Sequence, residues 1–273
     1  MKVVFTLVRK NLLESRWLLL ICSAALFGLC WLFVYVAHRI EAAIGEATGG
    51  GRSPVGMLRG LGGSSMDFST AAIEMAFWNH PFVLLIFSIW AIARGSIAVA
   101  GEIEKGTMDL VLSRPVDRSA FLASQVITAV LGLALMAGAM LVGNVIGSRY
   151  HTLIAPASAA TLAKPALNLM AFGWAIFGYT FVLSTLDIAR WRPNLIGSVA
   201  TLAGFIALVL ANIPQLEVEW LARFSIFKAY DPVEVVVKGE SLAFNAGVLG
   251  LIGLVGVGLG FVLFARRDLP AGS

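Results

Sequence analysis

Apolar residues are arranged in six long blocks that charged residues hardly interrupt. The hydrocarbon core of a membrane is about 30 Å thick, and a helix needs about 20 apolar residues to cross it. Each block has about this length, so the pattern predicts an all-α integral membrane protein with six transmembrane helices. The predicted spans cover residues 17–36, 81–100, 121–147, 165–186, 193–213 and 242–265.

The polar segments between the blocks predict the orientation of the chain. An even number of spans puts both termini on one side, and lysine and arginine are about twice as dense in the segments on that side. Because cytoplasmic segments carry the excess of basic residues, we expect both termini to be cytoplasmic. External loops are then expected at about 37–77, 148–164 and 214–241, with an inner loop at about 101–119. Residues 1–273 form a single transmembrane domain in this interpretation.

Composition and charge support a membrane protein and exclude several other classes. Hydrophobic residues make up 59% of the chain and charged residues 13%, whereas a soluble domain carries about 25% charged residues. The net charge of +4 is attributed to membrane orientation, so no nucleic-acid partner is expected. Cys22 and Cys30 are too far apart on one helix to form a disulfide, and we expect free thiols. The three histidines lack ligand neighbours at metal-site spacing, and no metal site is expected.

The chain shows no sign of a catalytic site of its own. None of the usual spacings of nucleophile, base or metal ligands occurs, so an enzyme is not expected. The dipeptide Gly-Lys of a phosphate-binding loop is absent from the sequence, so any ATP hydrolysis has to come from a partner. The predicted spans contain no Asp, Glu or Lys, which disfavours a proton-driven exchanger. Arg94 is the exception, and we expect its side chain to snorkel to the cytoplasmic interface.

The inner loop carries the signals of a short helix of its own. Gly106 can end the preceding helix, and Thr107 can cap a new one with Asp109 in its first turn. Pro115 stops that helix within about two turns. We therefore expect a short amphipathic helix from Thr107 to Ser113, held at the cytoplasmic surface between the second and third spans.

This inner loop resembles that of the ABC-2 type transporter permeases, which has the form G-E-x-E-x-G-T-(L/M)-x-x-x-L-x-x-P-(V/I)-x-R. The matching positions are Gly101, Glu102, Glu104, Gly106, Thr107, Met108, Leu112, Pro115, Val116 and Arg118. The family commonly has a lysine seven residues after the arginine, where this chain has Gln125. The resemblance implies a coupling element that docks on a separate ATPase subunit, which would bind the ATP and Mg²⁺. The residues expected to contact that partner or shape the loop are Glu102, Glu104, Gly106, Thr107, Asp109, Arg114, Pro115 and Arg118.

The resemblance extends to both ends of the chain and to the last external loop. The amphipathic start from Phe5 to Trp17 looks like the family's N-terminal interfacial helix, and residues 264–269 look like its usual ending. Residues 224–232 resemble the family's S-P-F-x-x-Y-D-P stretch, with Ile226 in place of the proline. Independently, the residues Asp231, Pro232 and Glu234 form a capping box. They predict a short external helix before the sixth span.

Small residues predict where helices pack against one another. The fifth span carries four on one face, Ala200, Gly204, Ala207 and Ala211. Such faces allow backbones to approach closely in lipid, and the resemblance implies a seam between two permease copies here. The sixth span carries Gly247, Gly250, Gly253, Gly256 and Gly260. For this span we favour packing within one bundle.

These patterns together predict the permease subunit of an ATP-binding cassette exporter in the plasma membrane, in a bacterium the inner membrane. Its expected partners are an ABC ATPase subunit, a second permease copy or paralogue, and membrane lipid, with no cofactor bound by the chain itself. Two alternatives remain open. One is an ATP-independent channel or secondary carrier, and the other is a membrane scaffold that moves no substrate. The sequence does not identify the substrate.

Overall fold

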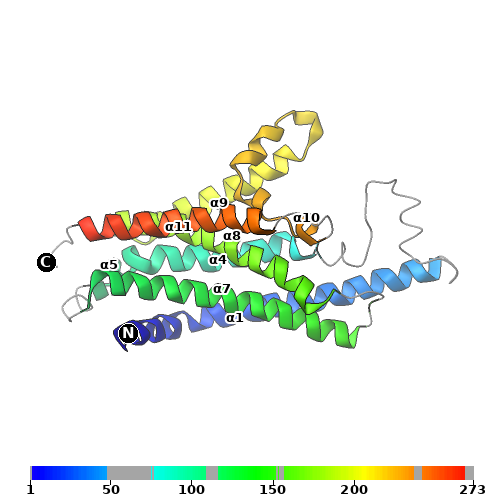
Figure 1. Ribbon diagram of the computed structural model, residues 1–273, viewed down its shortest axis with the longest axis horizontal. Coiled ribbons are helices and arrows are strands. Elements are labelled where there is room, and N and C mark those ends of the chain that lie inside the picture. The colour runs from blue at the N-terminus through cyan, green and yellow to red at the C-terminus, as the bar shows by residue number, and fades with distance from the viewer. Residues whose placement is uncertain are drawn as a thin grey trace.

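The computed structural model of the chain is a bundle of long helices in which residues 2–47, 75, 77–108, 116–151, 153, 157–236 and 242–267 are described. The described residues contain no β-strand. Six helices are long and apolar enough to cross a membrane, which confirms the prediction of six such elements. They are α1 (Lys2–Ala47), α4 (Pro81–Ser96) with its helical continuation to Glu104, α7 (Arg118–Tyr150), α8 (Ala159–Leu186), α9 (Trp191–Ala211) and α11 (Leu242–Arg266). Both termini lie at the same end of the bundle (Figure 1).

Two helices extend well beyond the predicted spans. Helix α1 has 46 residues and is about 69 Å long, more than twice the thickness of a hydrocarbon core. It continues through residues 37–47, where the sequence predicts an external loop, because residues 37–44 contain neither proline nor glycine. Helix α8 begins six residues before Pro165, since the hydroxyl of Ser158 accepts a hydrogen bond from the Thr161 amide at 3.1 Å and caps it.

Helices α4 and α8 form the centre of the bundle, and α9 lies at its edge. In the most apolar part of the α4 span, 67% of the residues are buried, and in that of α8 61% are buried. The corresponding fraction for α9 is only 17%. Large aromatic side chains fill the centre, among them Trp90, Phe172 and Phe177. Trp90 also donates a hydrogen bond from its indole nitrogen to the Ala129 carbonyl of α7 at 3.3 Å. The outer face of α9 is therefore left to lipid or to another protein.

Glycines bring α8 and α11 into backbone contact. A Cβ atom built on Gly256 would lie 2.5 Å from the carbonyl carbon of Gly178, and one built on Gly178 would lie 2.7 Å from the Cα of Gly253. The indole of Trp174 packs over Gly253 and donates a hydrogen bond to the Gly250 carbonyl at 3.2 Å. The prediction that the glycines of the sixth span pack within the bundle is thus confirmed for Gly253 and Gly256. Two backbones at this distance leave no room for a side chain.

The segment between α9 and α11 folds back against the bundle after projecting sideways from it (Figure 1). It consists of three 3₁₀ turns, η2 (Pro214–Leu216), η3 (Glu219–Phe224) and η4 (Ile226–Ala229), followed by the short helix α10 (Pro232–Val236). Two hydroxyl groups fix it. Ser225 donates to the Gly204 carbonyl at 2.7 Å, and the buried Tyr230 donates to the Trp78 carbonyl at 3.0 Å.

Replacing Tyr230 with phenylalanine tests this attachment. The variant keeps the ring but loses the bond to Trp78, which we expect to cost about 1 to 2 kcal/mol because the carbonyl stays buried. Burial also raises the pKa of Tyr230 well above its ordinary value, so the wild type resists ionisation when folded. Its stability should therefore fall as the pH rises above about 10, where the unfolded tyrosine ionises. Thermal melting in detergent at pH 7 and at high pH measures both effects, and the phenylalanine variant should show a smaller loss at high pH.

Both cysteines are unpaired, as the sequence predicts. Cys22 and Cys30 are buried free thiols in α1. Among the described residues, no group of histidine, cysteine and acidic side chains is arranged to hold a metal ion.

Candidate functional site

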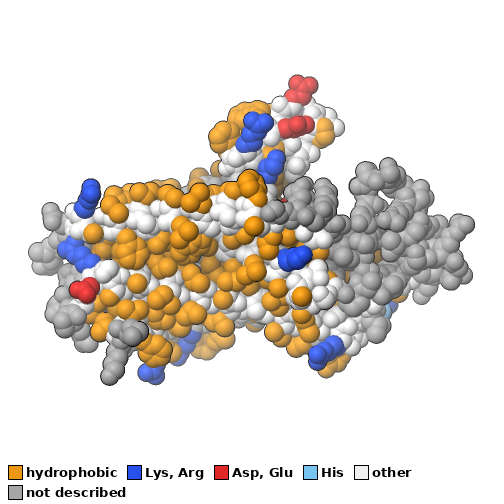
Figure 2. Space-filling view, in the orientation of Figure 1, with side chains coloured by type: hydrophobic (Ala, Val, Ile, Leu, Met, Phe, Trp, Pro, Cys, Tyr) orange, Lys and Arg blue, Asp and Glu red, His pale blue; other side chains and the backbone are white. Residues whose placement is uncertain are grey.

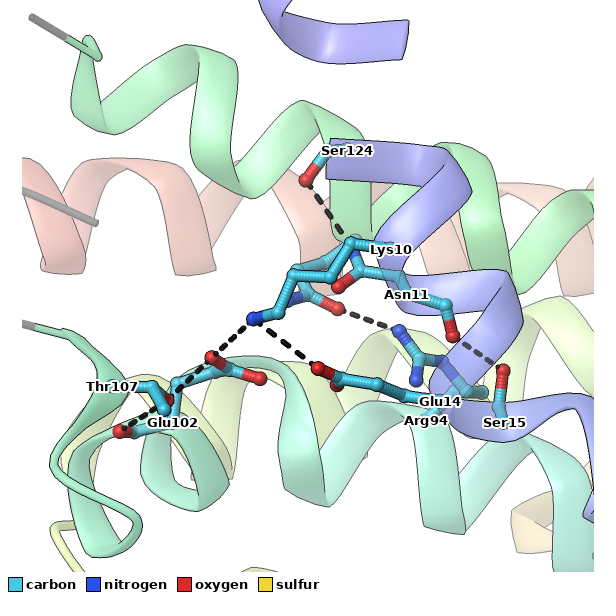
Figure 3. A network of polar contacts seen from close by, with 9 residues as sticks. Lys10, Asn11, Glu14, Ser15, Arg94, Glu102, Thr107 and Ser124 are labelled. Carbon is cyan, nitrogen blue, oxygen red and sulfur yellow. Dashed lines mark hydrogen bonds and ion pairs between the residues drawn. The ribbon is translucent and has the colours of Figure 1, made fainter. Parts of the chain in front are cut away.

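Polar and charged side chains cluster inside the bundle at the end that carries both termini (Figure 3). They come from the start of α1, from the start of α7, and from the end of α4 and its continuation. That continuation consists of a π-helical segment, η1 (Ile97–Gly101), and one helical turn, α5 (Glu102–Glu104). Together they extend the second span to residue 104, four residues beyond the predicted end.

Ser184 of α8 holds the π-helical segment in place. Its hydroxyl oxygen accepts hydrogen bonds from the amides of Val99, at 3.1 Å, and Ala100, at 2.9 Å. The same hydroxyl donates to the Ser96 carbonyl at 2.9 Å. Short π-helical segments widen the helix by one residue and are frequent at functional sites. Here the segment turns the next residues toward α1.

Glu102 lies at the centre of the cluster and is only 2% exposed. Its Oε2 atom accepts a hydrogen bond from the Lys10 ammonium at 3.1 Å and one from the Thr107 hydroxyl at 2.7 Å (Figure 3). Lys10 lies on α1, and Thr107 lies beyond the turn that ends α5. A buried carboxylate is stable only when it is paired and hydrogen-bonded, and these two partners supply both. Glu102 therefore joins the first helix to the inner loop.

Arg94 lies deeper in the same cluster and does not snorkel. Its side chain is 4% exposed, and its Nη2 atom donates to the Gln125 side-chain oxygen at 2.6 Å. The carboxylates of Glu102 and Glu14 interact with it electrostatically. The expectation of a snorkelling arginine is wrong because α7 supplies an acceptor inside the bundle. The prediction of spans without acidic residues also fails, because the second span continues through the π-helical segment to Glu102.

Two further contacts involve α1: one joins it to α7, and the other pairs Lys10 with a carboxylate on the same helix. The side-chain amide of Asn11 donates to the Ser124 hydroxyl at 3.4 Å, and both residues are buried. Glu14 lies one turn after Lys10 and 3.5 Å from its ammonium group. Lys10 thus bridges two carboxylates, one on its own helix and one at the start of the inner loop (Figure 3).

The inner loop is also attached to α9. The exposed carboxylate of Glu104 accepts a hydrogen bond from the Arg190 amide at 2.6 Å, directly before α9 begins. Acidic groups at a helix N-terminus stabilise it by pairing with free amides and with the helix dipole. Gly106 follows with a positive φ of 67°, and its amide donates to the Ile103 carbonyl at 2.9 Å. This is the geometry of a glycine that ends a helix, as its position in the sequence suggests.

Two arginines connect the start of α7 with the ends of α11 and α8. Arg118, the first residue of α7, donates to the Arg267 carbonyl at 2.8 Å and lies over the Phe264 ring, its guanidinium carbon 5.8 Å from the centroid. Arg267 in turn donates to the carbonyls of Thr185, at 2.6 Å, and Asp187, at 3.0 Å. Cationic groups are favourable at helix C-termini, so Arg118 braces the end of α11 and Arg267 braces the end of α8.

Several predicted site residues lie outside the described residues or are only partly described. Asp109, Arg114 and Pro115 are among the residues that the structure does not describe, as is most of the predicted helix from Thr107 to Ser113. For the predicted external cap, α10 begins at Pro232, and the Asp231 carbonyl accepts from the Val235 amide at 3.2 Å. The side chain of Glu234 is not described.

The predicted seam on α9 does not form one uniform face. Ala200 is exposed, Gly204 and Ala207 are half-buried, and Ala211 is buried. Gly204 packs against its own chain, since its carbonyl accepts the Ser225 hydroxyl. Between α4 and α9 lies an open cavity of about 660 Å³. It is walled mainly by apolar side chains, with Arg190, Asn194, Ser198 and Thr201 as polar groups on the α9 side.

The sequence pattern did not predict most of the residues that hold the cluster together. Lys10, Asn11, Ser184 and Gln125 all act through partners far away in the chain, the Arg94–Gln125 pair being 31 residues apart and the Lys10–Glu102 pair 92. Gln125 carried one signal, because it stands where the resembling family commonly has lysine. In chemical terms the described part of the cluster offers charged groups and hydrogen-bond donors and acceptors, among them the Thr107 hydroxyl on the Glu102 carboxylate.

The chain matches no known family model and has no significant match among curated proteins. Function therefore has to be inferred from the residues and their geometry.

Proposed function

We propose that the chain is the membrane-spanning permease subunit of an ATP-binding cassette transporter of the ABC-2 type. The observation that carries this proposal is the attachment of the inner loop. Its first residues bind α1 through Glu102 and α9 through Glu104, and its last, Arg118, binds the end of α11. A force applied to this loop would reach three other helices directly. The loop motif in residues 101–118 supports the same assignment.

In this proposal the end that carries the termini is cytoplasmic, and a separate ATPase subunit docks there. ATP binding brings two ATPase subunits together, and each pushes on the inner loop of one permease. The π-helical segment between α4 and α5 is where such a push would bend the second span most easily, because its hydrogen bonds run through Ser184 of α8. Motion of α4 against α9 would change the cavity between them. A second copy or paralogue would pair with this chain, and the membrane would be the plasma membrane, in a bacterium the inner one.

Copurification from mild detergent tests the proposal. A tagged chain is expected to bring down an ATPase in stoichiometric amount, identified by mass spectrometry and by ATP hydrolysis in the eluate. Deleting residues 104–107 should abolish that association while the chain stays monodisperse. A chain that purifies without any ATPase, and still moves solute in vesicles, would overturn the assignment.

Gly106 offers a sharper test, because only its backbone conformation restricts substitution. A Cβ there would meet no atom within 4 Å, but its φ of 67° is unfavourable for most residues and least so for asparagine. We expect Gly106→Val to strain the loop by about 1 to 2 kcal/mol and to reduce ATPase binding or ATP-driven transport several-fold. Gly106→Asn is the matched control and should retain both. Equal activity of the two variants would mean that this turn does not shape the docking loop.

One observation favours a second candidate, a secondary carrier. Arg94 and Glu102 are buried ionisable residues in the second span, which the structure extends to Glu104, and such residues are typical of proton or ion coupling. This candidate predicts that the purified chain alone takes up solute in vesicles under a proton gradient. Uptake that instead needs ATP and a partner excludes it.

A further inference from the structure

A long groove lies between the first half of α1 and the first half of α7, on the opposite side of α1 from the polar cluster's Glu102 contact. Its volume is about 1060 Å³. Apolar side chains form most of its walls, among them Val8, Leu12 and Leu19 from α1 and Ile127, Leu131 and Leu135 from α7. Ile127, Leu131 and Leu135 are exposed. The groove therefore offers a continuous apolar surface to whatever lies beside these two helices.

Among the described residues that line this groove, two arginines are the only charged ones. Arg9 and Arg16 are exposed and lie seven positions apart, two helical turns, on the groove side of α1. In the described part of the chain neither one forms an ion pair. Arg16 lies over the ring of Trp17, its guanidinium carbon 5.4 Å from the centroid. The nearest acidic residue in the sequence, Glu14, is paired with Lys10.

The register of the two helices shows how the groove is oriented. The Asn11–Ser124 hydrogen bond aligns the start of α1 with the start of α7. At 1.5 Å per residue, Leu135 then lies further from the end that carries the termini than both arginines, by about 20 Å for Arg9 and about 9 Å for Arg16. Figure 2 shows hydrophobic side chains along the middle of the visible face and basic ones nearer its two ends. Val4, Phe5 and Val8 line the groove before the two arginines, and Leu19 and Leu135 line it beyond them.

We propose that this groove binds an anionic glycerophospholipid. Arg9 and Arg16 hold its phosphate and headgroup, and one acyl chain lies along Leu19, Ile127, Leu131 and Leu135. Each basic residue near a membrane surface favours an anionic lipid by about fivefold. A lipid bound here would contact the same helix, α1, that carries Lys10, the partner of Glu102. This site depends only on the chain lying in a membrane, and it stands or falls independently of the proposed function.

A second copy of the chain is a poorer occupant. It would have to present acidic residues to Arg9 and Arg16, but the exposed faces of α9 and α11 are apolar, with members such as Leu202 and Leu254. An anionic lipid supplies the charge and the chain together. The groove is also open along its length and lies at the periphery of the bundle, where bilayer lipid reaches it.

Native mass spectrometry of the detergent-purified full chain tests the proposal with two lipids of identical acyl chains, phosphatidylglycerol and phosphatidylcholine. The wild type should retain one phosphatidylglycerol in preference to phosphatidylcholine. The double variant R9Q/R16Q should lose about 30-fold of that preference at low salt, and raised salt should weaken the wild-type preference as well. The variant R39Q/R149Q is the matched control, because it removes one exposed arginine from the other end of α1 and one from the far end of α7.

A bulky side chain placed in the groove tests the contact with the acyl chain without changing the charge. Ala123→Trp should block the acyl chain and abolish retention of phosphatidylglycerol, while Ala139→Trp, on the same helix but outside the groove, should not. Equal retention of the two lipids by the wild type would overturn the proposal, as would the same loss of preference in R39Q/R149Q. An Ala123→Trp variant that turns a dimer into a monomer but keeps its lipid would assign the groove to a second copy instead.

Discussion

Replacing Gly256 with valine is expected to unfold the bundle at a temperature about 10 °C lower than the wild type. A Cβ at this position would lie 2.5 Å from the carbonyl carbon, 2.6 Å from the carbonyl oxygen and 2.9 Å from the Cα of Gly178. All three are backbone atoms of α8, so no side chain can move aside, and the helices have to separate. Overpacking of this kind costs about 3 kcal/mol or more. Separation would also remove the indole bond from Trp174 to the Gly250 carbonyl.

Gly258 provides the matched control on the same helix. It lies two positions further along α11, is exposed, and has no atom within 4 Å of its Cβ position. Gly258→Val should therefore melt within about 2 °C of the wild type, because a surface change away from packing contacts costs little. Size-exclusion chromatography after heating in detergent measures the fraction of intact bundle for both variants. Similar melting of the two variants would mean that α8 and α11 do not pack this closely.

The six long helices follow from a physical requirement that is local in the sequence. Each one needs about 20 apolar residues in a row, and this can be counted without knowing the fold. The glycine face of α11 is local too, because its spacing marks one side of a helix. Helix ends were less predictable. Residues 37–47 contain charges that suggest a loop, but nothing before Gly45 stops α1, and helix propagation is favourable once the helix is formed.

The polar cluster depends on contacts that no local pattern reveals. Arg94 was expected to snorkel to the cytoplasmic interface, yet Gln125 of α7 accepts its hydrogen bond within the bundle. Glu102 and Thr107 were singled out through the loop motif, but their shared partner Lys10 lies on α1, 92 positions before Glu102. The role of Ser184 also depends on the unusual backbone that it binds, since the π-helical segment presents the amides of Val99 and Ala100 to its hydroxyl.

Glu102 should be the most sensitive residue of that cluster. Glu102→Ala removes the common acceptor of Lys10 and Thr107, and it also removes a negative charge that favours the buried Arg94 guanidinium. Removing one partner of a buried ion pair costs about 3 to 5 kcal/mol. The side chain of Lys10 is 35% exposed and regains some hydration, so we expect a cost of about 2 to 3 kcal/mol. Glu102→Gln keeps an acceptor for Thr107 and should cost about half as much.

Glu104→Gln is the control for this prediction, because it changes an exposed carboxylate two positions later and should lower the melting temperature much less. A double-mutant cycle with Lys10→Met isolates the contact itself. If Lys10 and Glu102 are bonded, the loss in the double variant is smaller than the sum of the single losses. Additive losses would show that α1 and the inner loop are not joined here. In the proposed transporter, a real coupling energy in this cycle should be accompanied by a loss of ATP-driven transport in Glu102→Gln, because the loop could then move without moving α1.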